Sequence, residues 1–147
     1  MTNKQKDDLF YVCALIEYVA RYSKNRRGVI VHALGEEGIK KQLYDAEVNH
    51  CLSFEQVCDE LMEWYQIPFG DFDPSKDSPY AIPGYLDIGR LYAIMIEDCA
   101  EPGEEIKELI HLFSSFLSDA ISDFKTDLYY QNPSYLECSY KAGYLLE

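Results

Sequence analysis

Residues 7–22 read DDLFYVCALIEYVARY, and their apolar side chains recur every three or four positions. This spacing predicts one buried face of an α-helix. The first row of apolar residues consists of Leu9, Val12, Cys13, Ile16, Val19 and Ala20. A second row beside it consists of Tyr11, Leu15, Tyr18 and Tyr22. Two adjacent rows require cover on more than one side, so we expect the rest of the chain to pack around this helix.

Helical periodicity recurs along the chain and predicts an all-α fold of about six helices. The clearest start signal is Ser53, followed three residues later by Gln56, which is the pattern of a capping box. Residues 29–34 are β-branched, so a strand is an alternative there, but we favour a short helix closed by Gly35. The other predicted helices are 36–48, 54–65, 85–99, one from 101–105 to about Leu128, and 135–146.

Residues 67–83, IPFGDFDPSKDSPYAIP, interrupt the helical pattern with four prolines and one glycine. The segment is too apolar for a free linker, so we expect an ordered connector laid across the helices. We therefore predict one compact domain, 1–147, and keep open a division into subdomains 1–66 and 84–147. The alternating residues Asp71, Asp73, Ser75 and Asp77 resemble the start of a calcium-binding loop. Lys76 and Ile82 stand where that loop needs Gly and Glu, which favours a simple acidic turn.

The composition suits one soluble globular domain, with 147 residues of which 48% are hydrophobic. Thirteen basic against 26 acidic residues give a net charge of −13, which disfavours contact with nucleic acids and anionic membranes. We therefore expect a basic protein partner. The five scattered cysteines predict reduced thiols that serve mostly as small core residues in a cytoplasmic protein. We expect neither a signal peptide nor a membrane span.

Residues able to carry chemistry are few. His50, Cys51 and Cys58 lie close together in the sequence, but three ligands without a second pair favour a helix-end histidine over a zinc site. A Cys–His nucleophile pair is a weaker alternative, because nothing marks either thiol as activated. His111 is expected to be a half-buried structural histidine, and the basic cluster at Lys24, Arg26 and Arg27 a solvated turn. We predict no catalytic residue, no metal and no cofactor.

Two polar residues are candidates for burial, Glu17 and His50. Glu17 lies between Ile16 and Tyr18 on the most apolar helix, so we expect it to pair with Arg21 or with the connector backbone.

The tyrosines Tyr129, Tyr130 and Tyr135 are the candidate interaction surface. They flank the helix break at residues 131–133. An equally good interpretation is that they pack the last helix against the body.

The segment from Leu9 to Tyr65 resembles a family of small uncharacterised bacterial helical proteins. The resemblance depends on FYVCALIEYVA, the Gly38-Ile39 pair, Tyr44, His50 and FEQVCDELMEWY. Members of that family are often encoded beside suspected toxin genes, which implies an antitoxin or another regulatory binding role. The matching positions, none with a known chemical role, are Ile16, Glu17, Gly38, Tyr44 and His50. The second half of the chain has no counterpart.

These observations predict a non-enzymatic cytoplasmic protein-interaction or regulatory protein, and the resemblance implies an antitoxin-like role. One alternative is an acidic mimic of nucleic acid that inhibits a DNA-binding enzyme. That alternative requires acids arrayed over one face, whereas the acids here are interspersed with apolar rows. The other alternative is a small enzyme that uses Glu17, His50 or a cysteine.

Overall fold

The computed structural model describes residues 1–76 and 78–146. Within them the fold is all-α, as predicted, with seven α-helices, one short 3₁₀ helix and no strand. The α-helices are α1 (Asn3–Ser23), α2 (Arg27–Asn49), α3 (Phe54–Trp64), α4 (Tyr85–Cys99), α5 (Glu105–Phe113), α6 (Phe116–Ile121) and α7 (Pro133–Ala142). The 3₁₀ helix η1 is Leu128–Tyr130. Across the described part of the chain, no helix has the length and apolarity that crossing a membrane requires.

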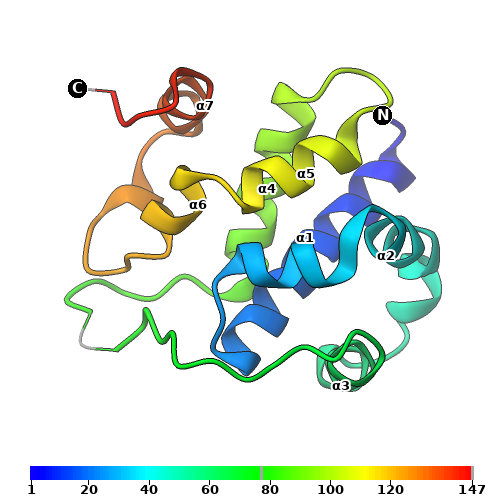
Figure 1. Cartoon of the computed structure of the whole chain (residues 1–147). Helices are drawn as coiled ribbons and strands as arrows, with labels where there is room; N and C mark the ends of the chain where they lie inside the picture. Colours follow the sequence, from blue (N-terminus) through cyan, green and yellow to red (C-terminus); the bar gives the residue numbers. More distant parts are fainter. Residues whose placement is uncertain (77, 147) are drawn as a thin grey trace.

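Helix α1 lies at the centre and packs against α2, α3 and, most extensively, α4 (Figure 1). It begins with a capping box, in which the Thr2 side chain accepts from the Gln5 backbone and the Gln5 side chain accepts from Thr2. The whole first apolar row is buried. In the second row Tyr11 and Leu15 are buried, whereas Tyr18 is half-buried and Tyr22 is exposed. The helix therefore reaches the surface at both ends, at residues 3–7 and toward Tyr22, and is buried between them.

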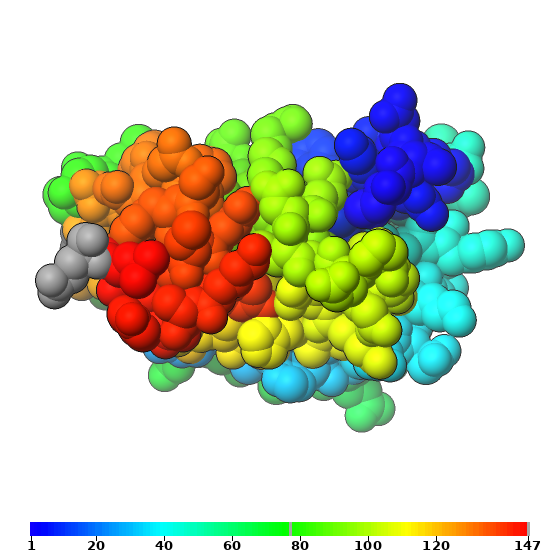
Figure 2. Space-filling model, turned by 90° about the horizontal axis from the view of Figure 1, so that it is seen from above, coloured from blue at the N-terminus to red at the C-terminus, as the bar shows by residue number. Residues whose placement is uncertain are grey.

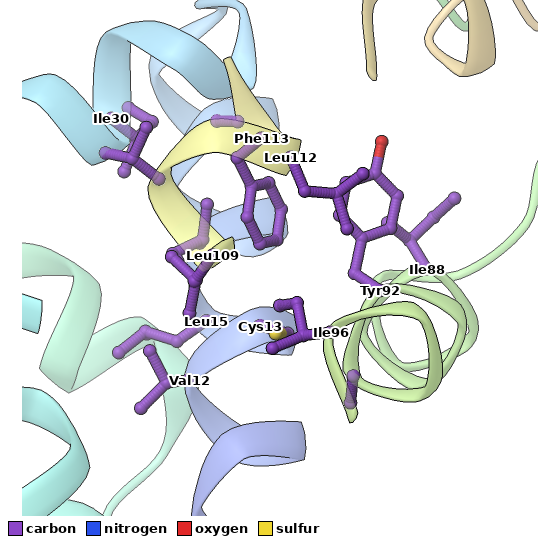
Figure 3. Close-up of a cluster of buried hydrophobic side chains, with 14 of the residues drawn as sticks. Val12, Cys13, Leu15, Ile30, Ile88, Tyr92, Ile96, Leu109, Leu112 and Phe113 are labelled. Carbon is purple, nitrogen blue, oxygen red and sulfur yellow. The ribbon is translucent and has the colours of Figure 1, made fainter. Parts of the chain in front are cut away.

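The contact between α1 and α4 is close enough to require a glycine. A Cβ atom built on Gly89 would lie 2.7 Å from the backbone and side chain of Ala14. Around this crossing, Cys13 of α1, Ile96 of α4 and Phe113 of α5 lie in one hydrophobic cluster (Figure 3). The ring of Tyr92 belongs to the same cluster and lies 4.4 Å, centroid to centroid, from Phe113. The core is thus shared between the two halves of the chain.

Helix α2 is kinked at Gly35, whose φ of 68° and ψ of 178° are not helical. The two predicted helices, 29–34 and 36–48, are the two halves of α2, and the alternative of a strand at 29–34 is wrong. Helix α3 begins with the predicted capping box, in which Ser53 Oγ accepts from the Gln56 backbone N–H at 3.1 Å. Local signals in the sequence therefore located these boundaries.

The predicted long helix ending near Leu128 is wrong. Helix α5 stops at Phe113, and α6 starts again at Phe116 with Ser115 as its N-cap. The Ser115 hydroxyl also donates to the Leu112 carbonyl at 2.7 Å, which closes the end of α5. The apolar pattern continues across the break because one face of α6, with Leu117 and Ile121, is buried as well. Helix α7 ends at Ala142 and is capped by Gly143 (φ 87°), before the predicted end at Leu146.

The connector, 67–83, contains no helix among its described residues, and it is fastened to the C-terminal end of α1. The Gly70 N–H donates to the Ser23 carbonyl at 2.8 Å, and the Phe72 N–H donates to the Lys24 carbonyl at 2.9 Å. A Cβ on Gly70 would lie 2.5 Å from the Lys24 carbonyl oxygen, so only glycine permits this approach. Asp77 of the calcium-loop pattern lies outside the described residues.

Seen from above, the N-terminal residues of α1 and the C-terminal residues around α7 occupy opposite ends of the molecule (Figure 2). Helices α4 and α5 lie between them.

Candidate functional site

The most polar part of the interior is an ion pair between Glu17 on α1 and Arg27 at the start of α2. Arg27 Nε lies 2.6 Å from Glu17 Oε1, and Arg27 Nη2 lies 3.1 Å from Glu17 Oε2. Both side chains are 3% exposed. Such a two-point pairing satisfies the fork of the guanidinium and both carboxylate oxygens. Burial acts to lower the pKa of Arg27, but Glu17 raises it above its ordinary value, so Arg27 is charged.

The other edge of Arg27 binds polar groups from two distant segments, α4 and the region of α6. Its Nη1 atom donates to the Tyr92 hydroxyl at 3.0 Å, to the Ser118 carbonyl at 2.8 Å and to Ser122 Oγ at 2.6 Å. The Tyr92 hydroxyl donates in turn to Ser118 Oγ at 3.0 Å. Burial raises the pKa of Tyr92 to about 12, so its hydroxyl remains a donor at neutral pH. This network joins α1, α2, α4 and α6.

Arg21 extends the network to the connector. Its Nε atom donates to Glu17 Oε2 at 2.9 Å, and its Nη2 atom donates to the Pro83 carbonyl at 2.6 Å. The sequence therefore identified Glu17 and its neighbour Arg21 correctly, but it missed Arg27, which is buried and does not lie in a solvated turn. No local signal identifies Arg27, because Tyr92, Ser118 and Ser122 lie 65 to 95 residues further along the chain.

Three adjoining cavities lie over this network, and all three are lined by Phe72 and Pro74 of the connector. We call them together the connector groove. The largest has a volume of about 730 Å³ and extends from Arg26 to Lys125. The smallest reaches Glu17, Arg27 and Ser122, so the buried network forms the floor of the groove. The Arg26 guanidinium lies 4.3 Å from the centroid of the Phe72 ring.

A second surface feature is a line of aromatic rings beside α1, which we call the aromatic row. It consists of Tyr11, Tyr18, Tyr22, Phe54, Phe69 and Tyr85. Ring centroids lie 5.2 Å apart for Tyr11–Phe54, 5.8 Å for Phe54–Tyr18 and 5.1 Å for Tyr18–Tyr85. Tyr22 and Phe69 form a separate pair, with 5.7 Å between their centroids. Tyr18 and Tyr22 are neighbours on one face of α1.

Exposure increases along the aromatic row. Tyr11 is buried, Tyr18, Phe54 and Tyr85 are half-buried, and Tyr22 and Phe69 are 48% and 68% exposed. Partial burial raises the pKa of Tyr18, and the nearby carboxylates of Glu55 and Asp59 on α3 contribute to the rise. Both carboxylates are exposed, so the row has a negatively charged border.

The prediction that His50 is buried is wrong. His50 is exposed at the end of α2, and its ring packs on Tyr11 with 4.5 Å between centroids. His111 is also exposed, not half-buried; its Nδ1 atom hydrogen-bonds with the Tyr140 hydroxyl, which donates to Glu108 Oε2 at 2.7 Å. Both histidines are therefore exposed side chains that contact buried tyrosine rings.

The cysteines follow the expectation only in part. Cys13 and Cys58 are buried and Cys99 is half-buried, but Cys51 and Cys138 are exposed. Burial raises the pKa of Cys58 to about 12, which disfavours the thiolate that a nucleophile or a metal ligand needs. Within residues 1–76 and 78–146, no three His, Cys, Asp or Glu side chains are arranged to hold a metal ion.

The three candidate tyrosines are tied to the body of the protein to different degrees. The Tyr130 hydroxyl donates to the Ala81 carbonyl at 2.7 Å, and the Tyr135 hydroxyl donates to the Leu146 carbonyl at 2.7 Å. Tyr129 packs edge-on against Tyr130, with 5.0 Å between ring centroids. Tyr130 is exposed, whereas Tyr129 and Tyr135 are half-buried.

Comparison of the chain with protein-family models, with curated proteins and with solved structures gives no match.

Proposed function

We propose that this chain is a non-enzymatic, cytoplasmic protein-binding protein that captures a basic protein partner on the aromatic row. The observation that carries the proposal is the increase in exposure along the row, from Tyr11 in the core to Tyr22 and Phe69 at the surface. A row of rings that is held in the core at one end and exposed at the other offers a partner a large apolar area. Little side-chain entropy is lost on binding, as with tyrosines in other binding surfaces.

Charge supports a cationic partner. Glu55 and Asp59 border the row near Tyr18, and the chain carries a net charge of −13. A partner segment that presents both apolar and Lys or Arg side chains would match the rings and their border, and the negative field would speed its association. An antitoxin-like role, in which the partner is a toxin held inactive, is the form of this proposal that the family resemblance favours.

The test is capture by the full chain, immobilised, from an extract of its native host. The double variant Tyr22→Ser/Phe69→Ser should lose the captured partner, because it removes the two most exposed rings of the row. Tyr44→Ser is the matched control, since Tyr44 is 85% exposed on α2 and belongs to no ring pair of the row. Raising the salt concentration should weaken capture, because the charged border is exposed.

Three outcomes would contradict the proposal. The double variant could retain the partner, the Tyr44 control could lose it, or the captured protein could lack a basic surface. A partner that DNA displaces would support the alternative of a nucleic-acid mimic instead.

A further inference from the structure

We propose that the connector groove binds a small phosphate-bearing molecule. The first argument is the balance of charge. Among the described residues, six cationic side chains line the three cavities against four carboxylates, in a chain with twice as many acidic as basic residues. The cations are Arg21, Lys24, Arg26, Arg27, Lys76 and Lys125, and the carboxylates are those of Glu17, Asp73, Asp119 and Asp123.

The four carboxylates already have donors within the protein. Glu17 binds Arg21 and Arg27, and Asp119 lies 3.3 Å from Arg26 Nη1. Asp73 accepts from the Ser75 hydroxyl at 2.6 Å, and Asp123 accepts from the Lys125 backbone N–H at 3.2 Å. By contrast, the ammonium groups of Lys24, Lys76 and Lys125 form no ion pair within the described part of the chain. Counted over all three cavities, the described side chains therefore carry an excess of two positive charges that can attract an anion, while in the largest cavity three cations face three carboxylates.

Helix α2 adds a second attraction for anions. Its N-cap, Arg26, makes no side-chain capping hydrogen bond, and its first turn contains no acidic residue. The first half of α2, before the kink at Gly35, therefore begins without a capping side chain or an acidic residue of its own. The carboxylates near this end are those of Glu17 and Asp119, which pair with Arg27 and Arg26. Arg26 and Arg27, at this end, both line the groove, so the partial positive charge of the helix end adds to that of the cations that line the groove.

Size and surroundings favour a small molecule over a polymer or a membrane. The largest cavity, about 730 Å³, lies within the range of small-ligand sites, and Phe72, Pro74 and Ala120 provide an apolar wall. Nucleic acids and anionic lipid surfaces are large enough to face the whole molecule, so the net charge of −13 repels them. Beyond about 8 Å that repulsion is screened at physiological salt, so a small ligand responds mainly to the cations that touch it.

The test is isothermal titration calorimetry and thermal unfolding of the full chain in a phosphate-free buffer with three probes. The probes are ATP, inorganic pyrophosphate and adenosine. We expect ATP and pyrophosphate to bind and to raise the melting temperature, and adenosine to do neither. The variant Lys76→Gln/Lys125→Gln should weaken ATP binding at least tenfold, because it removes two cations that line the largest cavity.

The control, Lys6→Gln/Lys107→Gln, removes the same charge away from the groove and should bind ATP as the original chain does. The proposal fails if neither ATP nor pyrophosphate binds, if adenosine binds as tightly as ATP, or if both double variants lose affinity equally. The last result would indicate general charge attraction only. The outcome is independent of the aromatic row, because none of the four lysines belongs to it.

Discussion

Arg27 Nε lies 2.6 Å from Glu17 Oε1, and this pair joins the first two helices inside a core that α4 and α6 complete. A buried ion pair contributes little net stability compared with apolar residues of the same size, but removing one partner leaves an uncompensated charge. Glu17→Ala should therefore lower the free energy of unfolding by about 3–5 kcal/mol. Urea denaturation followed by circular dichroism measures this change.

Two further variants separate the ion pair from general effects. Glu17→Leu/Arg27→Met should cost less than Glu17→Ala, because no charge remains buried without a partner. Glu63→Ala, at an exposed site on α3, should change stability by no more than about 0.5 kcal/mol. A Glu17→Ala variant as stable as the Glu63 control would contradict the assigned role of the pair.

The α1–α4 crossing predicts a strong effect from a single methyl group. Gly89→Ala places a Cβ 2.7 Å from Ala14 and should destabilise the fold by about 1–3 kcal/mol or more, since both helices must shift. Gly28→Ala, in helix α2, is the matched control, because its new Cβ would lie 3.6 Å from Ser114 Cα, which is an ordinary van der Waals contact. The control should be neutral or stabilising by up to about 1 kcal/mol through helix propensity. Melting temperatures of the two variants in the reverse order would refute the close contact.

Glu137 on α7 predicts a pH-dependent stability. Burial, followed by the proximity of Asp98, raises the pKa of Glu137 to about 7. Between the ordinary carboxyl pKa and pH 7, Glu137 is protonated in the folded state but not in the unfolded state. The contribution of Glu137 to the free energy of unfolding therefore falls as pH rises through that window. Glu137→Gln should therefore raise the melting temperature at pH 8 and flatten its dependence between about pH 4.5 and 7.

The comparison for Glu137 is Glu101→Gln, at an exposed position in the loop before α5. That variant should keep the slope of the original protein. Equal slopes for the Glu137 variant and the original chain would show that Glu137 does not titrate in this window.

The five thiols should differ in reactivity toward an aromatic disulfide reagent. Cys51 and Cys138 are exposed and should react first in the folded protein, followed by the half-buried Cys99. Cys13 and Cys58 are buried, with pKa values raised by burial, and should react only after unfolding in urea. Mass spectrometry of peptides after timed labelling measures each site, and early labelling of Cys13 would argue against the position of α1 in the core.

The sequence predicted helices best where the start and stop signals are local. The range 85–99 coincides with α4, and the Ser53–Gln56 capping box starts α3. The break between α5 and α6 was missed because the apolar spacing runs through it without interruption. Only the Ser115 hydroxyl, which caps both helix ends, marks the boundary, and serine is too common to be recognised as a stop.

The sequence predicted only part of the buried network, because only some of its contacts are local. Glu17 is conspicuous as a charge between apolar neighbours, and Arg21 is its partner one turn away. Arg27 follows a helix end and looks solvated until Ser118 and Ser122 fold over it. His50 was expected inside as a helix-end histidine beside Cys51 and Cys58, but the end of α2 lies at the surface, where the His50 ring is exposed and packs on Tyr11.

The partnership of α1 with α4 has a consequence during synthesis. Ribosomes make α1 first, yet its most extensive contact, α4, begins only at Tyr85. Until that residue has left the exit tunnel, the side of α1 around Ala14 has no packing partner. Its apolar side chains are then exposed and can be bound by chaperones. A nascent chain arrested within the connector should therefore be bound by chaperones and cut by proteases, whereas one arrested beyond α5 should resist both.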